Sequence, residues 1–194
     1  MKFLLKHSSI GIKFPGRLSI LLKSTQIWSI ILLKGGDRMA ILKKLKDYLE
    51  NNKVSYEVGH HQRVYTAQEI AAAQHVPGKE MAKVVMVKAN GQMVMLVLPA
   101  SYRVETKKLK GVLNCKKVGI LKEDEFQNLF PDCEIGAMPA LGNLYNLEVW
   151  VDKVLTENES IVFQAGSHVE TLRIKYNDYA RLVNPKVGDF SVHL

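Results

Sequence analysis

The chain has 194 residues, which is enough for one substantial domain and barely enough for two small ones. Apolar residues make up 47% and charged residues 24%, a globular composition that excludes global disorder. Cys115 and Cys133 are too few for a disulfide scaffold or a cysteine-based zinc site, so we expect reduced thiols and a cytoplasmic protein. The formal net charge of +8 is compatible with nucleic-acid binding, but its distribution matters more than its total.

The positive charge is concentrated at the N-terminal end. Residues 1–38 hold seven basic residues and one acidic residue, a charge of +6, which leaves +2 for residues 39–194. Lys23 interrupts the apolar stretch 19–33, so no run approaches the roughly 18–20 apolar residues that span a bilayer. We therefore expect no membrane segment.

Residues 1–38 are basic, contain serine and have almost no acid, a composition that suits a transit peptide or a membrane-surface segment. Another interpretation fits better. Residues 34–37 read Lys-Gly-Gly-Asp, which purine-rich ribosome-binding DNA can encode, and Met39 follows shortly after. We therefore expect residues 1–38 to be translated upstream DNA or a dispensable extension, and residues 39–194 to be one domain.

Helical and strand patterns follow one another after Met39. Residues 41–49 carry apolar side chains at helical spacing. Thr66 and Glu69 form a capping box, in which a hydroxyl and a carboxylate satisfy free backbone amides, so a second helix begins there. Asn90-Gly91 lies between two apolar runs and predicts a hairpin with a type I′ turn.

The predicted elements are interspersed without regular strand–helix–strand repetition. In chain order they are a helix from Met39 to about Asn52, a strand at 54–58, a helix at 66–75, hairpin strands at 83–88 and 93–98, a Lys-rich helix at 104–113, a strand at 118–121, a helix at 123–130, strands at 147–151, 161–164 and 172–175, and a helix at 178–183. This order favours an α+β fold with a mixed, curved sheet over a doubly wound fold.

The residues carry no strong signature of a metal or cofactor site. The six histidines lack the spacing of a zinc protease helix, and none neighbours a cysteine. The sequence also contains no Walker lysine motif, no Gly-x-Gly-x-x-Gly and no nucleophile elbow. We therefore expect no metal and no cofactor.

Three segments have both a functional and a structural interpretation. Residues 136–142, Gly-Ala-Met-Pro-Ala-Leu-Gly, form either a rigid loop that presents backbone amides to a ligand or an ordinary tight connection. Lys83 either points into a cleft as a fixed positive charge or extends to solvent. Residues 165–168, Ala-Gly-Ser-His, present a polar pair at a strand end or form a solvated turn.

Taken together, these segments resemble the YbaK/ProX family of aminoacyl-tRNA deacylases, which includes the editing domain inserted in bacterial prolyl-tRNA synthetases. The resemblance covers essentially all of residues 39–194. Its marks are His61-x-x-x-Tyr65-Thr66-Ala67-Gln-Glu69-Ile-Ala71, Ala82-Lys83-Val-Val, Gly136-Ala-Met-Pro139 with Leu141-Gly142, Val151-Asp152, and Ala165-Gly166-Ser-His168. Each mark alone is weak, but five in this order are specific.

The resemblance implies a mixed, barrel-like β-sheet surrounded by helices and the hydrolysis of the ester that joins a wrong amino acid to tRNA. Lys83 corresponds to the family's essential lysine, and we expect it to face a concave site opposite the turn of Pro139. Ala140 and Leu141 stand where relatives often carry a second proline and an aromatic residue, which leaves the preferred substrate size open.

An aminoacyl ester is already activated, so its hydrolysis needs a positioned water and support for the oxyanion. We assign Lys83 to anchoring a phosphate or aligning the ester, and backbone amides near Gly136 to the oxyanion. The expected substrate-binding or wall-forming residues are His61, Thr66, Ala137, Met138, Pro139, Gly142, Asp152, Gly166 and His168. The lysines expected to meet tRNA phosphates, or else to form a solvated face, are Lys107, Lys108, Lys110, Lys116 and Lys117.

The leading hypothesis is a metal-independent deacylase that acts in trans on a small amino acid, such as alanine or cysteine, carried by a tRNA such as tRNA-Pro. An aminoacyl-tRNA synthetase is a further candidate partner. The alternative is a non-catalytic module that binds a tRNA acceptor end, a nucleotide or a protein. A third hypothesis, a hydrolase of an unrelated small ester, predicts turnover without tRNA.

Overall fold

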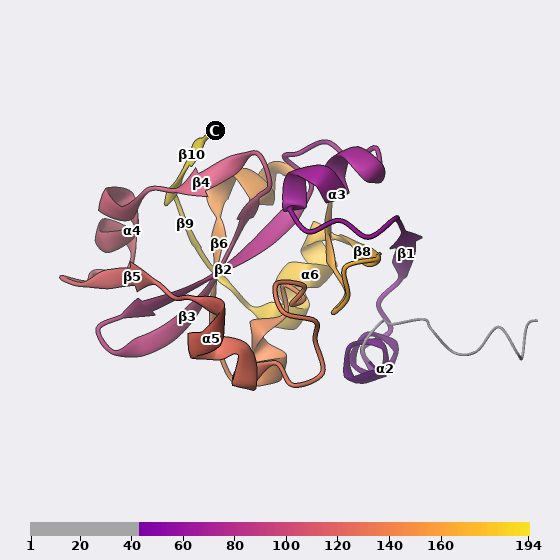
Figure 1. Cartoon of the computed structure of the whole chain (residues 1–194), viewed down its shortest axis with the longest axis horizontal. Coiled ribbons are helices and arrows are strands. Elements are labelled where there is room, and N and C mark those ends of the chain that lie inside the picture. The colour runs from indigo at the N-terminus through magenta and orange to yellow at the C-terminus, as the bar shows by residue number, and fades with distance from the viewer. Residues whose placement is uncertain (1–42) are drawn as a thin grey trace, which may run out of the picture. The chain divides into compact units, whose positions relative to one another are not determined.

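The computed structural model describes residues 43–194, so the expectation for residues 1–38 lies outside the described part of the chain (Figure 1). The α-helices are α2 (Lys43–Asn51), α3 (Ala67–Ala73), α4 (Thr106–Val112), α5 (Glu123–Phe126) and α6 (Tyr176–Val183). The strands are β1 (Tyr56–His60), β2 (Ala82–Ala89), β3 (Gln92–Pro99), β4 (Tyr102–Val104), β5 (Val118–Ile120), β6 (Glu148–Asp152), β7 (Ser160–Gln164), β8 (Glu170–Lys175), β9 (Lys186–Gly188) and β10 (Ser191–His193). Three short 3-10 helices are η1 (Gln127–Leu129), η2 (Gly142–Tyr145) and η3 (Lys153–Glu157).

A five-stranded mixed sheet, in the order β5-β2-β3-β6-β9, forms the centre of the fold. Strands β2 and β3 form the predicted hairpin, and Asn90 and Gly91 at its tip have φ angles of 49° and 91°, as a type I′ turn requires. Strand β6 pairs in parallel with both β3 and β9, so the sheet contains both orientations.

A three-stranded antiparallel sheet, β1-β8-β7, faces this centre, and β10 pairs with β4 in a third, two-stranded sheet. A parallel bridge between Met81 and Val162 joins the start of β2 to β7. The predicted α+β class and mixed sheet are confirmed. The sheets remain separate, however, and the central sheet is not closed into a barrel.

Side-chain alternation along β2 separates two sides of the central sheet. Ala82 and Met86 belong to the main core, which the central sheet shares with β7 and β8. Val87 belongs to a cluster on the other side, beneath α4. Met81 and Val162 lie in a third cluster with the apolar residues of α3. The outer side of β2 therefore runs from the cluster under α3 to the cluster under α4.

The regular elements with strong local signals are where the sequence places them. The Thr66 hydroxyl accepts the Glu69 amide, and the Glu69 carboxylate accepts the Thr66 amide, so the capping box at the start of α3 is confirmed. Strands β4, β9 and β10 were not predicted. Each has three residues, which is too short for a periodic pattern, and each depends on a partner distant in sequence.

Candidate functional site

Lys83 lies near the start of β2, on the outer side of the central sheet. Side chains alternate between the two faces of a strand, so Lys83 points the same way as Met81 and Val87, away from the main core. Its ammonium group donates a hydrogen bond of 3.2 Å to the carbonyl oxygen of Ala100. The side chain is half-buried, and this burial lowers the pKa of Lys83 below its ordinary value. The ammonium is in no ion pair among residues 43–194.

Strand β7 brings Gln164 to the same side of the fold as Lys83. Met81 and Val162 form a parallel bridge, in which paired side chains point the same way, and Lys83 and Gln164 each follow two residues later. The Gln164 side chain in turn contacts His168, with 3.4 Å between the amide nitrogen and Nδ1 of the ring. The parallel bridge thus links the strand of Lys83 to the segment that carries His168.

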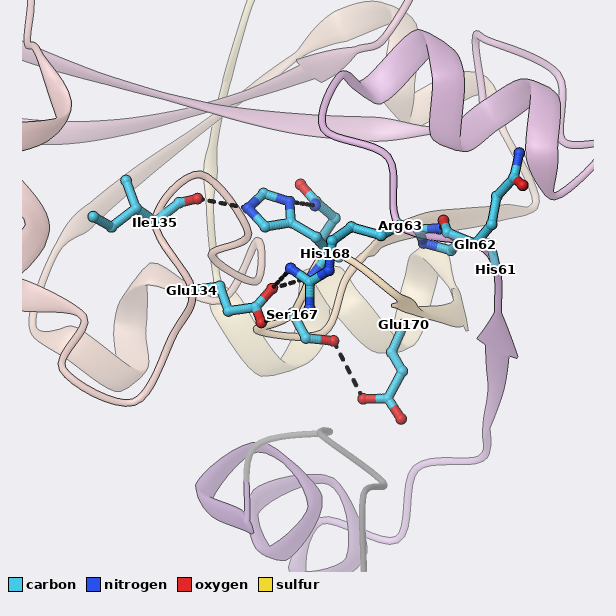
Figure 2. A network of polar contacts seen from close by, with 9 residues as sticks. His61, Gln62, Arg63, Glu134, Ile135, Ser167, His168 and Glu170 are labelled. Carbon is cyan, nitrogen blue, oxygen red and sulfur yellow. Dashed lines mark hydrogen bonds and ion pairs between the residues drawn. The ribbon is translucent and has the colours of Figure 1, made fainter.

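His168 is a buried residue whose two ring nitrogens both have partners (Figure 2). Nε2 lies 2.8 Å from the carbonyl oxygen of Ile135, which only accepts, so Nε2 carries the proton. Nδ1 then accepts from the Gln164 amide. Tyr65 packs against the ring edge-on, with 4.8 Å between centroids. These contacts make His168 a support for the loop that begins at Ile135.

Glu134 anchors that loop to two other segments (Figure 2). Its carboxylate accepts two hydrogen bonds from the Arg63 guanidinium, at 3.0 and 3.1 Å, and one of 2.8 Å from the backbone amide of His168. The Arg63 hydrogen bonds, followed by the His168 amide, lower the pKa of Glu134. The carboxylate is therefore ionised at neutral pH and holds the loop in place.

Gly136 follows Ile135 in this loop and lies beside the His168 ring. Its φ of +83° lies in the left-handed region, which favours glycine. A Cβ here would lie 3.3 Å from Glu123 Oε1 and 3.6 Å from His168 Cε1. The Gly136 N–H donates to no acceptor within residues 43–194, whereas the next amide, that of Ala137, donates to the Glu134 carbonyl. The Gly136 amide is therefore available to a ligand.

The rest of the loop is part of the core. Met138, Ala140 and Leu141 belong to the main hydrophobic cluster, and Ala137 and Pro139 are buried with them. The loop therefore meets a ligand through the backbone near Gly136, and the side chains of residues 137–141 provide a rigid foundation.

Two further glycines, Gly142 and Gly166, have structural roles in or beside this loop. A Cβ on Gly142 would approach Val149 Cγ2 to 2.7 Å, so this position needs close packing. Gly166, with a φ of +95°, donates to the Ala137 carbonyl and accepts from the Glu134 amide. These two bonds tie the loop of Gly136 to the turn before His168.

Two other expected site residues have structural partners. The buried Asp152 carboxylate accepts the backbone amides of Val154 and Phe190, each at 3.1 Å, so it fixes the start of η3 and a distant loop. The Thr66 hydroxyl is engaged in its helix cap. Both side chains therefore have structural partners within residues 43–194, and their place in a binding site stays a prediction.

His61 is fixed by contacts to its neighbours. Its Nδ1 donates 2.7 Å to the carbonyl of Gln62, and Nε2 is buried with no partner in the described part of the chain. The His61 backbone amide donates to the Val169 carbonyl, so the residue is fixed to the segment that follows His168.

Arg63, Glu134 and Gln164 were not expected among the site residues. Glu134 and Gln164 each lie within two residues of a quoted motif, and Arg63 lies inside one. Neither composition nor spacing signals that the Arg63 guanidinium meets a carboxylate 71 positions away. The signal appears only when the segments fold together.

The expected tRNA-binding lysines differ in their availability. Lys107, Lys110, Lys116 and Lys117 are exposed. Lys108 donates to the Asp189 carboxylate at 2.8 Å and to the Ser191 carbonyl at 3.1 Å, so its charge is already used within the fold.

Two cavities, of about 610 and 620 Å³, lie beside α2 and beside the tip of the β2–β3 hairpin. Neither is lined by Lys83 or Pro139, so the hollow expected between those residues is not one of these cavities. Residues 43–194 contain no cluster of three or more potential metal-binding His, Cys, Asp or Glu side chains. No helix in this range is long and apolar enough to span a bilayer.

Solved structures support the fold. The crystal structure of a proposed trans-editing enzyme for prolyl-tRNA synthetase is similar to this chain with a TM-score of 0.70 and 16% identity, over 81% of this chain and 99% of that one. A hypothetical protein of known structure is similar with a TM-score of 0.70 and 19% identity, over 77% of this chain and 100% of that one. At these identities the similarity concerns the fold alone.

Curated relatives are proline–tRNA ligases. That of Staphylococcus saprophyticus is 28% identical over 133 residues, which are 66% of this chain and 21% of the ligase. That of Staphylococcus aureus strain Newman is 26% identical over 176 residues, 81% of this chain and 28% of the ligase. This chain thus spans under a third of their length. The sequence pattern named Aminoacyl-tRNA editing domain matches residues 61–182, more than half of the chain. The chain belongs to the aminoacyl-tRNA editing domain family.

Proposed function

We propose that this chain is a trans-acting aminoacyl-tRNA deacylase, which hydrolyses the ester between tRNA and a small, wrong amino acid. Alanine or cysteine on a tRNA such as tRNA-Pro is the expected substrate, and the cytoplasm is its expected location. The observation that carries the proposal is the placement of Gly136 beside His168, which contacts Gln164 on β7, the strand that is bridged to the start of β2, in a chain of the editing family.

The proposed reaction needs orientation more than activation, because the ester is already reactive. Water adds to the carbonyl carbon, and the carbonyl oxygen takes up negative charge. The bond to the ribose oxygen then breaks, and a proton from the water passes to that oxygen. The neighbouring ribose hydroxyl is our candidate to assist the water, as the family resemblance implies. No metal takes part in this scheme.

Gly136 supplies the support for the oxyanion. Its amide is unused within the described residues, and the loop that carries it is fixed by Glu134 and His168. A donor that is held in place before the reaction stabilises developing charge without reorganisation. The left-handed φ of Gly136 turns this amide in a direction that residues with a Cβ rarely adopt.

Lys83 supplies a positive charge. Burial lowers the pKa of its ammonium group, and that group donates to a neutral carbonyl with no acidic partner among residues 43–194. We therefore assign Lys83 to holding the terminal phosphate or the ester carbonyl, with Ala100 as its present partner. Replacement of that weak neutral contact by an anionic one would strengthen the hydrogen bond.

A panel of mischarged tRNAs tests this function. Purified protein is incubated with tRNA-Pro carrying alanine, cysteine, serine or proline, and the loss of ester is followed over time. We expect the small residues to be released and proline to be spared, because an apolar site excludes a larger residue sterically more effectively than it rejects a smaller one. Hydrolysis of none of the esters would contradict the proposal.

The same panel, extended by an aminoacyl ester that lacks tRNA, distinguishes the rivals. A non-catalytic module would bind tRNA and leave every ester intact. A hydrolase of an unrelated small ester would act equally on an aminoacyl ester without tRNA. The curated relatives are proline–tRNA ligases, which supports a prolyl-tRNA synthetase as the partner whose errors are corrected.

A further inference from the structure

A second basic site lies at the far end of the β2–β3 hairpin. A groove of about 620 Å³ opens between the hairpin tip, β5 and the loop before β5. Lys88 from β2 and Lys116 and Lys117 from the loop line this groove, and all three side chains are exposed. The backbone amide of Asn90 donates to the Lys117 carbonyl at 3.3 Å, so the hairpin and the loop are fixed to each other.

The groove is strongly positive. None of its three lysines takes part in an ion pair among residues 43–194, in contrast to Lys108 on α4. Its one acidic lining residue, Glu125, has a carboxylate oxygen 2.8 Å from the backbone amide of Lys122, so that carboxylate caps α5. Three unpaired ammonium groups in one groove fit a polyanion.

The groove lies close enough to the candidate active site for one ligand to meet both. Lys88 lies five residues beyond Lys83 on β2, a distance of about 17 Å at the usual rise of a strand, and it points to the opposite face of the sheet. Across the surface, α5 links the two sites, because Glu123 at its start lies beside Gly136 and Glu125 near its end lines the groove. A ligand that extends from the Gly136 loop therefore reaches the groove over α5.

We propose that this groove binds the phosphate backbone of the tRNA acceptor arm, while the aminoacyl end occupies the site at Gly136. The inference rests on the proposed function, since it takes tRNA as the ligand. It adds Lys88 to the expected contacts and excludes Lys108, whose charge is paired with Asp189. Contacts of this kind recognise the RNA backbone and not its sequence.

The test measures binding of non-acylated tRNA over a series of salt concentrations. The groove variant replaces Lys88, Lys116 and Lys117 with glutamine. The control variant makes the same change at Lys53, Lys153 and Lys175, which are exposed on other elements and have no ion pair within residues 43–194. The two variants have the same net charge, so any difference between them depends on location.

We expect the groove variant to lose about tenfold or more in affinity, and its slope of log K against log salt to fall in magnitude by about 2 to 3, because each lost phosphate contact removes about 0.7 to 0.9. The control variant should retain most of the wild-type slope. Equal losses in both variants, or no loss in either, would overturn the proposal. Because the tRNA carries no amino acid, these results are independent of deacylation, and failure of the ester panel would contradict only the proposed activity.

Discussion

The position of Lys83 on β2 determines the surroundings and the pKa of its ammonium group. It lies at the edge of two apolar clusters, and its ammonium group has one neutral partner, the Ala100 carbonyl. Burial lowers the pKa because the charged form loses solvation. The sequence marks this residue as unusual, but the bridge between Met81 and Val162, which joins the start of β2 to β7, has no local signal.

The lowered pKa of Lys83 predicts a pH dependence of ligand binding. The ammonium is charged below its pKa and neutral above it, so affinity for an anionic ligand should fall as pH rises through that lowered value. A non-hydrolysable amide analogue of aminoacyl-adenosine 5′-phosphate is a suitable probe. Lys83→Arg should remove this dependence, since the guanidinium remains charged to about pH 12 or above. The same decline in both proteins would contradict the assignment.

His168 and Gln164 allow a second test at the level of single residues. The Ile135 carbonyl requires a proton on Nε2, so we expect nitrogen NMR shifts of a ring that is protonated at Nε2. Gln164→Leu removes the donor to Nδ1 and should lower kcat about tenfold, the worth of one hydrogen bond, with little change in KM. A ring protonated at Nδ1 in the wild type would contradict the positioning role.

At the scale of elements, local chemistry predicts the parts of the fold that depend on neighbouring residues. The capping box of α3 and the Asn90-Gly91 turn each lie within four residues, and both are confirmed. The candidate site depends on pairs such as Arg63 and Glu134, which are far apart in sequence. The sequence therefore predicted the loop of Gly136, but not the ionic contact that fixes it.

Replacement of glycine by alanine should have opposite effects on stability at Gly111 and at Gly142. Gly111 lies inside α4 with no atom within 4 Å of an added Cβ, so Gly111→Ala should stabilise the protein by about 0.5–1 kcal/mol through helix propensity. Gly142→Ala would place Cβ 2.7 Å from Val149 and should cost about 1–3 kcal/mol. Urea denaturation measures both. Changes of the same sign would contradict this account of packing.

At the scale of the whole molecule, the net charge is a poor guide to function. Most of the +8 belongs to residues 1–38, and residues 39–194 carry only +2. Within that part, Lys108 is neutralised by Asp189, whereas Lys88, Lys116 and Lys117 share a groove. Binding of a polyanion therefore depends on where unpaired lysines gather, which the composition does not reveal.

We propose that residues 39–194 carry the activity. The three hydrophobic clusters and the candidate site lie within residues 43–194, and the family pattern covers residues 61–182. A chain that starts at Met39 should therefore melt at the temperature of the full chain and deacylate at the same rate. Scanning calorimetry and the ester assay check this, and a clear loss of either property would show that residues 1–38 contribute.

The proposed function requires that ester hydrolysis takes place at the site formed by β2, β7 and the loop of Gly136. The most direct test is single-turnover deacylation of alanyl-tRNA-Pro by the wild type and by Lys83→Ala, with both proteins shown to be folded. We expect the wild type to exceed spontaneous hydrolysis clearly, and the variant to be about a hundredfold slower because the ester is no longer held in position. Equal rates for the two proteins would contradict the central claim.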